Sequence, residues 1–323
     1  MSEIVAVDIG GTHARFAIAA LEGGRVRGLS DEVVLRTADH PSLTAAWRRF
    51  ESDIGRALPR AAGIAVAGPV DGDVVALTNN LWMIRPATLG EELGVDDFVL
   101  VNDFGAVAHA VAHLEPGDFQ RLCGPDTPLP PVGVISVVGP GTGLGVALLI
   151  RTGAGGRVVE TEGGHVDFAP RDDLEDKILA RLRRQYRRVS VERLVSGPGL
   201  VNIYAALADI EGRPARTLED RALWRLALEG EDPLAVAALD RFCMMLGAFA
   251  GDMALAHGAH GVAVAGGLGL RMGDRLATTG FAQRFCAKGR FERRMADLPV
   301  RLIRRPEPGL MGAAAAFADR RGA

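Results

Sequence analysis

Cysteine is scarce in this sequence: only Cys123, Cys243 and Cys286 occur, far apart and without a C-x-x-C pair. The odd number and wide spacing disfavour both a disulfide framework and a cysteine zinc site. Free thiols are typical of a reducing compartment, so the sequence predicts a cytoplasmic protein.

An excess of charge is also lacking. The formal net charge is -3, the pI is about 6.2, and the arginines and lysines are scattered along the chain. Binding to a nucleic acid backbone requires a basic field, which this distribution does not supply. We therefore expect no nucleic acid partner.

Membrane signals are weak. The first residues include Glu3 and Asp8 and lack a basic start followed by an apolar run, so they do not predict a signal peptide. The most apolar long stretch, residues 244–270, is interrupted by Asp252 and several glycines. It predicts a buried helix followed by a strand, and no membrane partner.

The length of 323 residues predicts two domains, because a single hydrophobic core seldom grows that large. Apolar runs at residues 4–7 and 15–19 flank a glycine turn and predict a hairpin. A helical pattern at 43–58 precedes strands at 63–66 and 98–101. This alternation indicates an α/β fold.

A loop rich in proline and glycine, residues 116–133, predicts a domain boundary. A second hairpin at 134–150 resembles the first and suggests a duplicated unit. Helices are expected at 174–186, 199–208, 221–228 and 233–256, and a strand at 262–265. A terminal helix at 309–318 is expected to pack on the first domain. The predicted domains are therefore 1–113 completed by 303–323, and 114–302.

Three glycine-rich turns follow predicted strands: Asp8-Ile9-Gly10-Gly11-Thr12, Gly139-Pro140-Gly141-Thr142-Gly143-Leu144-Gly145, and Ala265-Gly266-Gly267. A single turn of this kind can serve only to shape a hairpin. Three together favour nucleotide binding, because glycine lets backbone N–H groups approach a phosphate. No P-loop motif occurs, and the first two turns lead into strands, whereas a dinucleotide-binding turn opens a helix.

The order of motifs resembles the bacterial glucokinase family over nearly the whole length. The first two glycine turns match its phosphate loops, and Val101-Asn102-Asp103-Phe104 matches its sugar and catalytic segment. Segments 162–168 and 192–199 match its other sugar-binding segments, and Ala265-Gly266-Gly267 its adenosine-side turn. His13 departs from the family pattern, which has asparagine there. The cysteine-rich zinc motif of the related ROK kinases is absent, which favours the zinc-free branch.

The resemblance implies a two-domain actin-like, ribonuclease-H-like α/β fold with an interdomain active-site cleft. It implies ATP-dependent phosphorylation of D-glucose to glucose 6-phosphate, and a homodimer. Asp103 would be the catalytic base, and Asp8 would hold Mg²⁺ through water. Glucose would contact Asn102, Asp103, Glu162, His165 and Glu192. ATP would contact Asp8, Gly10, Gly11, Thr12, Gly141, Thr142, Gly143, Gly266 and Gly267.

Several of these candidate residues could instead have another role. Asn102-Asp103 could cap a helix at 104–113, and Asp103 could do so while serving as a base. Glu162 could be a solvated loop charge and Glu192 a helix-end ion pair. His165 and Asp167 have the spacing of a non-haem iron site, with His257 or His260 as a third ligand.

Three other functions stay open. The chain could phosphorylate fructose, mannose or an amino sugar, since the pocket residues do not exclude them. It could be a sugar-sensing regulator, although such relatives carry an added helix-turn-helix before the first strand. It could be an actin-like filament or chaperone ATPase, which would not need the sugar segments.

Overall fold

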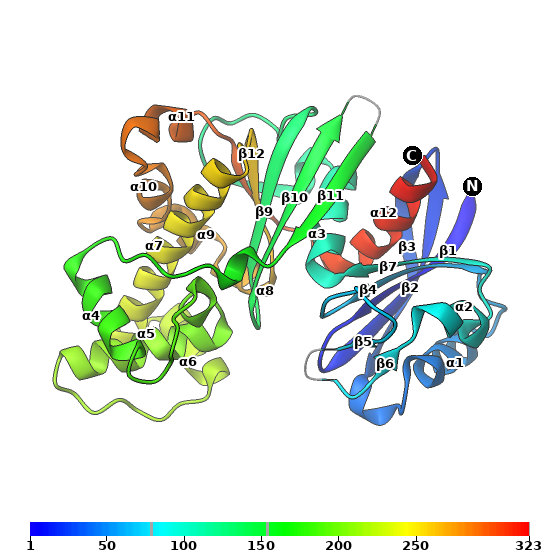
Figure 1. Ribbon diagram of the computed structural model, residues 1–323, viewed down its shortest axis with the longest axis horizontal. Coiled ribbons are helices and arrows are strands. Elements are labelled where there is room, and N and C mark those ends of the chain that lie inside the picture. Colours follow the sequence, from blue (N-terminus) through cyan, green and yellow to red (C-terminus); the bar gives the residue numbers. More distant parts are fainter. Residues whose placement is uncertain (78–79, 153–154, 323) are drawn as a thin grey trace. The chain divides into compact units, whose positions relative to one another are not determined.

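The computed structural model describes residues 1–77, 80–152 and 155–322, and Figure 1 shows its helices and strands. The chain divides into two compact units, residues 1–115 with 149–160 and 305–323, and residues 116–148 with 161–304. The segment 149–160, expected in the larger domain, groups with the first unit. The domain boundaries predicted from the sequence, between residues 113 and 114 and between 302 and 303, stay a prediction.

The first unit is built on a five-stranded sheet with the order β3-β2-β1-β4-β7. Its strands are β1 (Ser2–Ile9), β2 (His13–Glu22), β3 (Arg25–Arg36), β4 (Ala61–Val66) and β7 (Asp97–Asn102). The expected hairpin is present, since β1 and β2 pair antiparallel. Strands β1, β4 and β7 run parallel, so their carboxyl ends meet at one edge of the sheet.

Helices cover both faces of this sheet. Two pack on one face with the small hairpin of β5 (Val75–Ala76) and β6 (Met83–Ile84), namely α1 (Leu43–Ile54) and α2 (Pro86–Leu93). The other face receives α3 (Asp103–His113) and α12 (Pro308–Gly322). Helix α1 stops four residues before its predicted end because Gly55 adopts a left-handed conformation there.

Helix α12 approaches its neighbours at backbone distance. A Cβ atom at Gly63 of β4 would lie 2.0 Å from the carbonyl oxygen of Ala313, and one at Gly312 would lie 1.8 Å from that of Ala106. The surrounding contacts are made by alanines, including Ala65, Ala106, Ala313 and Ala316. Small side chains therefore let the C-terminal helix join the first unit.

The second unit repeats this plan. Its six-stranded sheet has the order β11-β10-β9-β12-β13-β8, in which most of β11 and the end of β10 belong to the segment 149–160 that groups with the first unit. The first five strands follow the same order as in the sheet of the first unit. Strands β9, β12 and β13 are parallel, like β1, β4 and β7. The bounds are β8 (Phe119–Cys123), β9 (Gly133–Pro140), β10 (Leu144–Thr152), β11 (Gly155–Thr161), β12 (Gly261–Val264) and β13 (Val300–Ile303). The shared order supports the suggested duplication.

One strand was missed, and one expectation needs correction. Strand β3 was not predicted, because its charged and mostly exposed residues show no clean alternation. The segment 116–133 was expected to be a loop but contains β8, which pairs antiparallel with β13. Arg301 of β13 helps to hold the rest of this segment in place, because its guanidinium donates hydrogen bonds to the carbonyl oxygens of Pro125 and Thr127.

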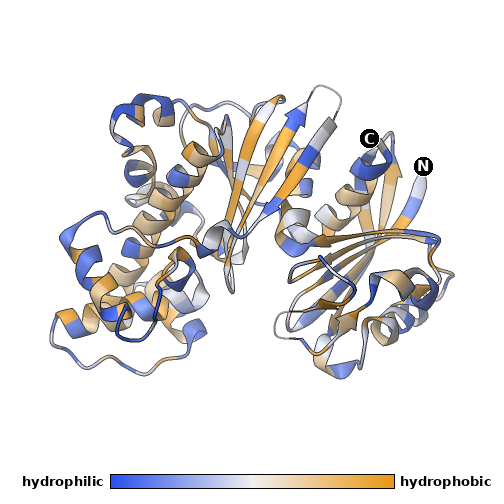
Figure 2. Cartoon of the chain, in the orientation of Figure 1, coloured by the Kyte–Doolittle hydropathy of each residue, from blue (hydrophilic) through white to orange (hydrophobic). Residues whose placement is uncertain are grey.

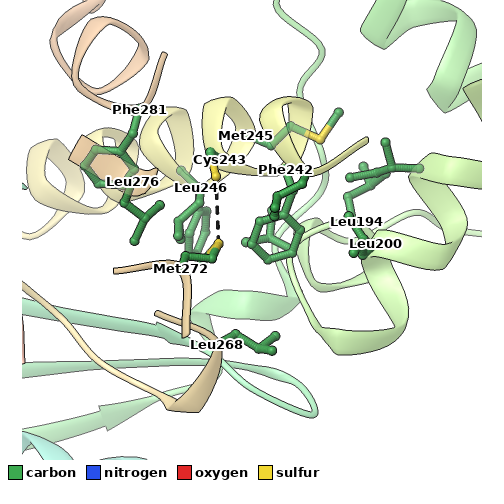
Figure 3. Close-up of a cluster of buried hydrophobic side chains, with 14 of the residues drawn as sticks. Leu194, Leu200, Phe242, Cys243, Met245, Leu246, Leu268, Met272, Leu276 and Phe281 are labelled. Carbon is green, nitrogen blue, oxygen red and sulfur yellow. Dashed lines mark hydrogen bonds between the residues drawn. The ribbon is translucent and has the colours of Figure 1, made fainter. Parts of the chain in front are cut away.

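The helices of the second unit surround a large apolar core. They are α4 (Asp173–Leu182), α5 (Gly197–Ile210), α6 (Asp220–Glu229), α7 (Pro233–Ala256), α8 (Gly267–Met272), α9 (Asp274–Thr278), α10 (Phe281–Cys286) and α11 (Glu292–Ala296). Figure 3 shows side chains of α7 packed against Leu268, Met272 and Leu276, with the Cys243 thiol 3.8 Å from the Met272 sulfur.

Helix α7 is coloured largely as apolar in Figure 2. Among the described residues it is the one helix long and apolar enough to cross a membrane, and 72% of its most apolar window is buried inside the protein. This burial is what the sequence predicted for residues 244–256, and β12 follows as expected. The apolar surface of α7 is used in the core.

We predict that Gly312→Ala destabilises the first unit, because the added methyl group collides with the backbone of α3. Overpacking of this kind costs about 2 kcal/mol, which corresponds to roughly 5 °C in Tm. Differential scanning calorimetry measures it. Gly28→Ala is the control, since a Cβ at Gly28 meets no atom within 4 Å. Equal Tm values for the two variants would contradict the close packing of α12.

Candidate active site

The first glycine turn joins β1 to β2, and its carbonyl groups accept hydrogen bonds from residues elsewhere in the first unit. Thr37 donates its hydroxyl to the carbonyl oxygen of Gly11 at 3.0 Å and its N–H to that of Thr12 at 3.0 Å. The amide of Asn80 donates to the carbonyl oxygen of Gly10 at 3.4 Å. These bonds fix the orientation of the peptide groups in the turn. A fixed glycine turn is suited to present N–H groups to an anion.

Asp8 lies at the end of β1, one residue before Ile9 and the turn. Desolvation raises the pKa of its carboxyl group to about 7, which Arg15 opposes and the charges of Asp103 and Glu307 reinforce. Arg15 itself forms an ion pair with Glu307 at 2.7 Å. Negative charge therefore gathers around Asp8, which favours binding of a cation beside it.

Asn102 and Asp103 lie where β7 ends and α3 begins. The side-chain oxygen of Asn102 accepts hydrogen bonds from the N–H groups of Phe104 at 2.9 Å and Gly105 at 3.2 Å, so Asn102 is the helix N-cap. Its amide nitrogen donates to the carbonyl oxygen of Gly68 at 3.1 Å. Asp103 is the first residue of the helix, and its Oδ1 accepts from the N–H of Phe104 at 2.8 Å. The carboxylate expected to act as a base is thus held at a helix start.

The second glycine turn joins β9 to β10 in the second unit. The N–H of Gly141 donates to the carbonyl oxygen of Gly143 at 2.8 Å, and the carbonyl of Gly141 accepts from the N–H of Gly197 at the start of α5. A Cβ at Gly266 would lie 2.5 Å from the carbonyl oxygen of Pro140. The turn at Gly266 and Gly267 therefore lies against the start of the loop that holds Thr142.

Three proposed sugar residues come together beside this loop. The Nε2 atom of His165 lies 3.8 Å from a carboxylate oxygen of Glu162 and 4.0 Å from one of Glu192. Glu192 also accepts a hydrogen bond from the N–H of Leu144 at 2.9 Å. Its side chain is 27% exposed, against 72% for Glu162 and 55% for His165, so Glu192 is the most firmly held of the three.

A cavity of about 330 Å³ opens in the second unit. Thr142 and Glu192 line it together with three other residues of the matched segment 192–199, namely Arg193, Ser196 and Pro198. Sequence reasoning did not select its remaining lining residues, which are Tyr186, Val201, Asn202 and Asp220. Arg193 lies over the ring of Tyr186 at 4.4 Å, and Asn202 donates to the carbonyl of Arg193 at 2.7 Å. The second glycine turn and one of the proposed sugar residues thus border the same space.

The structure does not support the iron reading. Asp167 pairs with Arg188 at 2.5 Å, and the Nδ1 atom of His257 lies 3.0 Å from the hydroxyl of the buried Ser136. The Nδ1 atom of His260 accepts from the N–H of Val134. Within residues 1–77, 80–152 and 155–322, no group of three or more His, Cys, Asp or Glu side chains could hold a metal ion.

Comparisons with known proteins decide the family. The family model described as Glucokinase matches residues 5–320. The glucokinase of Zymomonas mobilis subsp. mobilis is 62% identical over 318 residues, which is 98% of each chain. The chain belongs to the glucokinase family. Its resemblance to this family, and the α/β fold that the resemblance implied, are confirmed.

Solved structures agree with this assignment. The crystal structure of a glucokinase from an Antarctic psychrotroph has 35% identity and a TM-score of 0.87, and 98% of each chain is covered. A glucokinase from Balamuthia mandrillaris, in complex with glucose, has 21% identity and a TM-score of 0.80, and covers 99% of this chain and 94% of its own. The second likeness shows the two-domain actin-like fold alone.

The family motifs did not reveal the residues that support the first turn. Thr37 and Asn80 lie far along the chain from Gly10 and Gly11, and neither belongs to one of the family motifs. A threonine or an asparagine carries no signal of its own in a single sequence. Only the pairing of β2 with β3, which brings residues 36 and 37 beside the turn, identifies Thr37 as a partner.

We predict that Asp8→Asn makes the protein more stable at pH 8 and that this gain shrinks as the pH falls toward 4. The raised pKa of Asp8 means that the folded state holds a proton which the unfolded state releases above about pH 4. Folding therefore becomes less favourable as the pH rises from about 4 to 7. The asparagine removes this cost.

The measurement is Tm against pH in the absence of divalent cations and nucleotide, with the exposed Asp71→Asn as control. A lower Tm for Asp8→Asn at pH 8 would show instead that the ionised carboxylate stabilises the fold.

Proposed function

We propose that the protein transfers the γ-phosphoryl group of ATP to the 6-hydroxyl group of D-glucose, with Asp103 as general base. The observation that carries the proposal is the cluster of Glu162, His165 and Glu192 beside the second glycine turn. A group of carboxylates and an imidazole suits a ligand rich in hydroxyl groups. The 62% identity to a glucokinase supports the same substrate.

In the proposed reaction, the carboxylate of Asp103 accepts the proton of the sugar hydroxyl. The hydroxyl oxygen forms a bond to the γ-phosphorus as the bond from that phosphorus to the β,γ-bridging oxygen breaks, and ADP leaves. Fixing Asp103 at the start of α3 orients the base, and positioning is, together with electrostatic stabilisation, the main protein contribution to phosphoryl transfer.

The turns at Gly10, Gly11 and Thr12, and at Gly141, Thr142 and Gly143, are proposed to bind the phosphates, and Gly266 and Gly267 the adenosine side. Neither phosphate turn contains lysine. Backbone N–H groups must then compensate much of the charge. Asp8 fits a Mg²⁺ site, because the ion often keeps several waters and uses one or two carboxylates with the substrate phosphates. When bound, Mg²⁺ would neutralise charge on the phosphates.

A panel of sugars and phosphoryl donors on the purified protein tests the proposal, with glucose and ATP expected to give the highest kcat/KM. Preference for fructose, mannose or an amino sugar would establish the other-hexose alternative. Binding of sugar without phosphorylation would indicate a regulator, and ATP hydrolysis independent of sugar would indicate a filament or chaperone ATPase. We further propose a cytoplasmic location and a homodimer, which fractionation and light scattering test.

We predict that Asp103→Asn folds and binds glucose but loses turnover by about 10²- to 10⁴-fold, because the amide keeps the oxygen that accepts from Phe104 but cannot act as the base. Steady-state kinetics and calorimetric titration with glucose measure the two properties. Retention of more than about a tenth of the wild-type kcat would remove Asp103 from this role.

We predict that Glu192→Gln raises the KM for glucose much more than the KM for ATP. Glutamine keeps an oxygen for the N–H of Leu144, so the second turn stays in place while the charge offered to the sugar is lost. Glu192→Ala is the matched contrast, since it removes both interactions and should raise both constants. Equal effects of Glu192→Gln on the two substrates would assign Glu192 a structural role.

A further inference from the structure

Glu160 of β11 lies outside all the motifs that carry the family resemblance. Its Oε1 atom accepts a hydrogen bond from the backbone N–H of Asn102 at 3.0 Å. Strand β7 is the last strand of the first sheet, so N–H groups on its outer side have no neighbouring strand to pair with. Glu160 supplies an acceptor at the residue directly before Asp103.

The same carboxylate lies over the first turn of α3. A Cβ atom at Gly105 would be 2.2 Å from Oε1 of Glu160 and 2.7 Å from its Cδ and Cγ. The three nearest atoms all belong to Glu160. The missing side chain at Gly105 therefore makes room for this carboxylate between the end of β7 and the helix.

The remaining bonds of Asn102 are independent of Glu160. Its side chain caps α3 and donates to Gly68, as described above. Loss of Glu160 would therefore free the peptide group before Asp103 while the helix start stays capped. A hydrogen bond to an ionised acceptor is stronger than one between neutral groups, so this contact can set the peptide orientation.

We infer that Glu160 is a positioning residue for the proposed base: it fixes the peptide at Asn102 and thereby the direction in which Asp103 presents its carboxylate. The inference rests on the proposed function of Asp103. Small misplacements of a reacting group can lower a rate by up to about 10²-fold, so a second carboxylate that never touches the sugar can still affect turnover.

Two substitutions at Glu160 test the contact. Glu160→Ala is expected to lower kcat about tenfold or more and to leave the KM for ATP within about twofold. Glu160→Gln keeps an oxygen acceptor for the N–H of Asn102 and should restore most of the kcat. The exposed Glu51→Ala of α1 controls for the loss of a charge.

Gly105→Ala provides an independent route to the same defect, because its methyl group displaces the carboxylate of Glu160. It should lower kcat to a similar extent on its own. In the Glu160→Ala background the methyl group has room, so the double variant should be no slower than Glu160→Ala. Such non-additivity is expected for two residues in direct contact.

Hydrogen exchange of the segment 99–106 reports the peptide directly and needs no substrate. It should be faster in Glu160→Ala than in the wild type and in Glu160→Gln. Unchanged exchange, a kcat for Glu160→Ala within about twofold of wild type, or losses that multiply in the double variant would overturn the inference. A wild-type protein that fails to phosphorylate glucose would refute the proposed function instead, and the exchange would still decide the role of Glu160.

Discussion

Close approach of one backbone to another, or to a carboxylate, is the constraint on which both units depend. Gly63 and Gly312 let α12 lie directly on β4 and α3, which completes the first unit. Gly143 leaves room for Glu192, whose carboxylate would otherwise be 2.5 Å from a Cβ atom. In each case glycine is needed because a backbone carbonyl or a carboxylate occupies the space that a Cβ atom would take. The same lack of a side chain therefore shapes both the helix packing and the candidate site.

The second constraint is electrostatic. In the first unit, Asp8 and Asp103 are close enough for the charge of one to raise the pKa of the other, and Arg15 is partly neutralised by Glu307. This arrangement costs stability while no cation is bound. A bound cation would offset this cost, because its positive charge compensates the charges of the carboxylates. The dependence of stability on pH therefore measures the cost of charging Asp8 in the folded protein.

Sequence patterns predicted the parts of the fold that depend on local rules. Both hairpins, the N-cap at Asn102, the buried helix α7 and the strand β12 follow from alternation, capping and apolar runs. Strand β3 was missed because its partner β2, and not its own composition, determines its conformation. Thr37, Asn80 and Glu160 were missed for a related reason. Each acts through a hydrogen bond to a distant backbone group, and a single sequence carries no signal for such a pair.

The hydrogen bonds of Asn102 limit how this residue can contact a sugar. Its oxygen already accepts two backbone N–H groups, and one of its two amide hydrogens is donated to Gly68. Within the described residues one N–H of this amide then remains for a ligand, so a hydroxyl group at the proposed contact with Asn102 has to act as an acceptor. Glu162 and Glu192, when ionised, can only accept, so hydroxyl groups that contact them have to donate. If the proposed contact at Asn102 forms, a hydroxyl that accepts from this amide keeps its own proton, which it can then donate to a carboxylate such as that of Asp103, the proposed base.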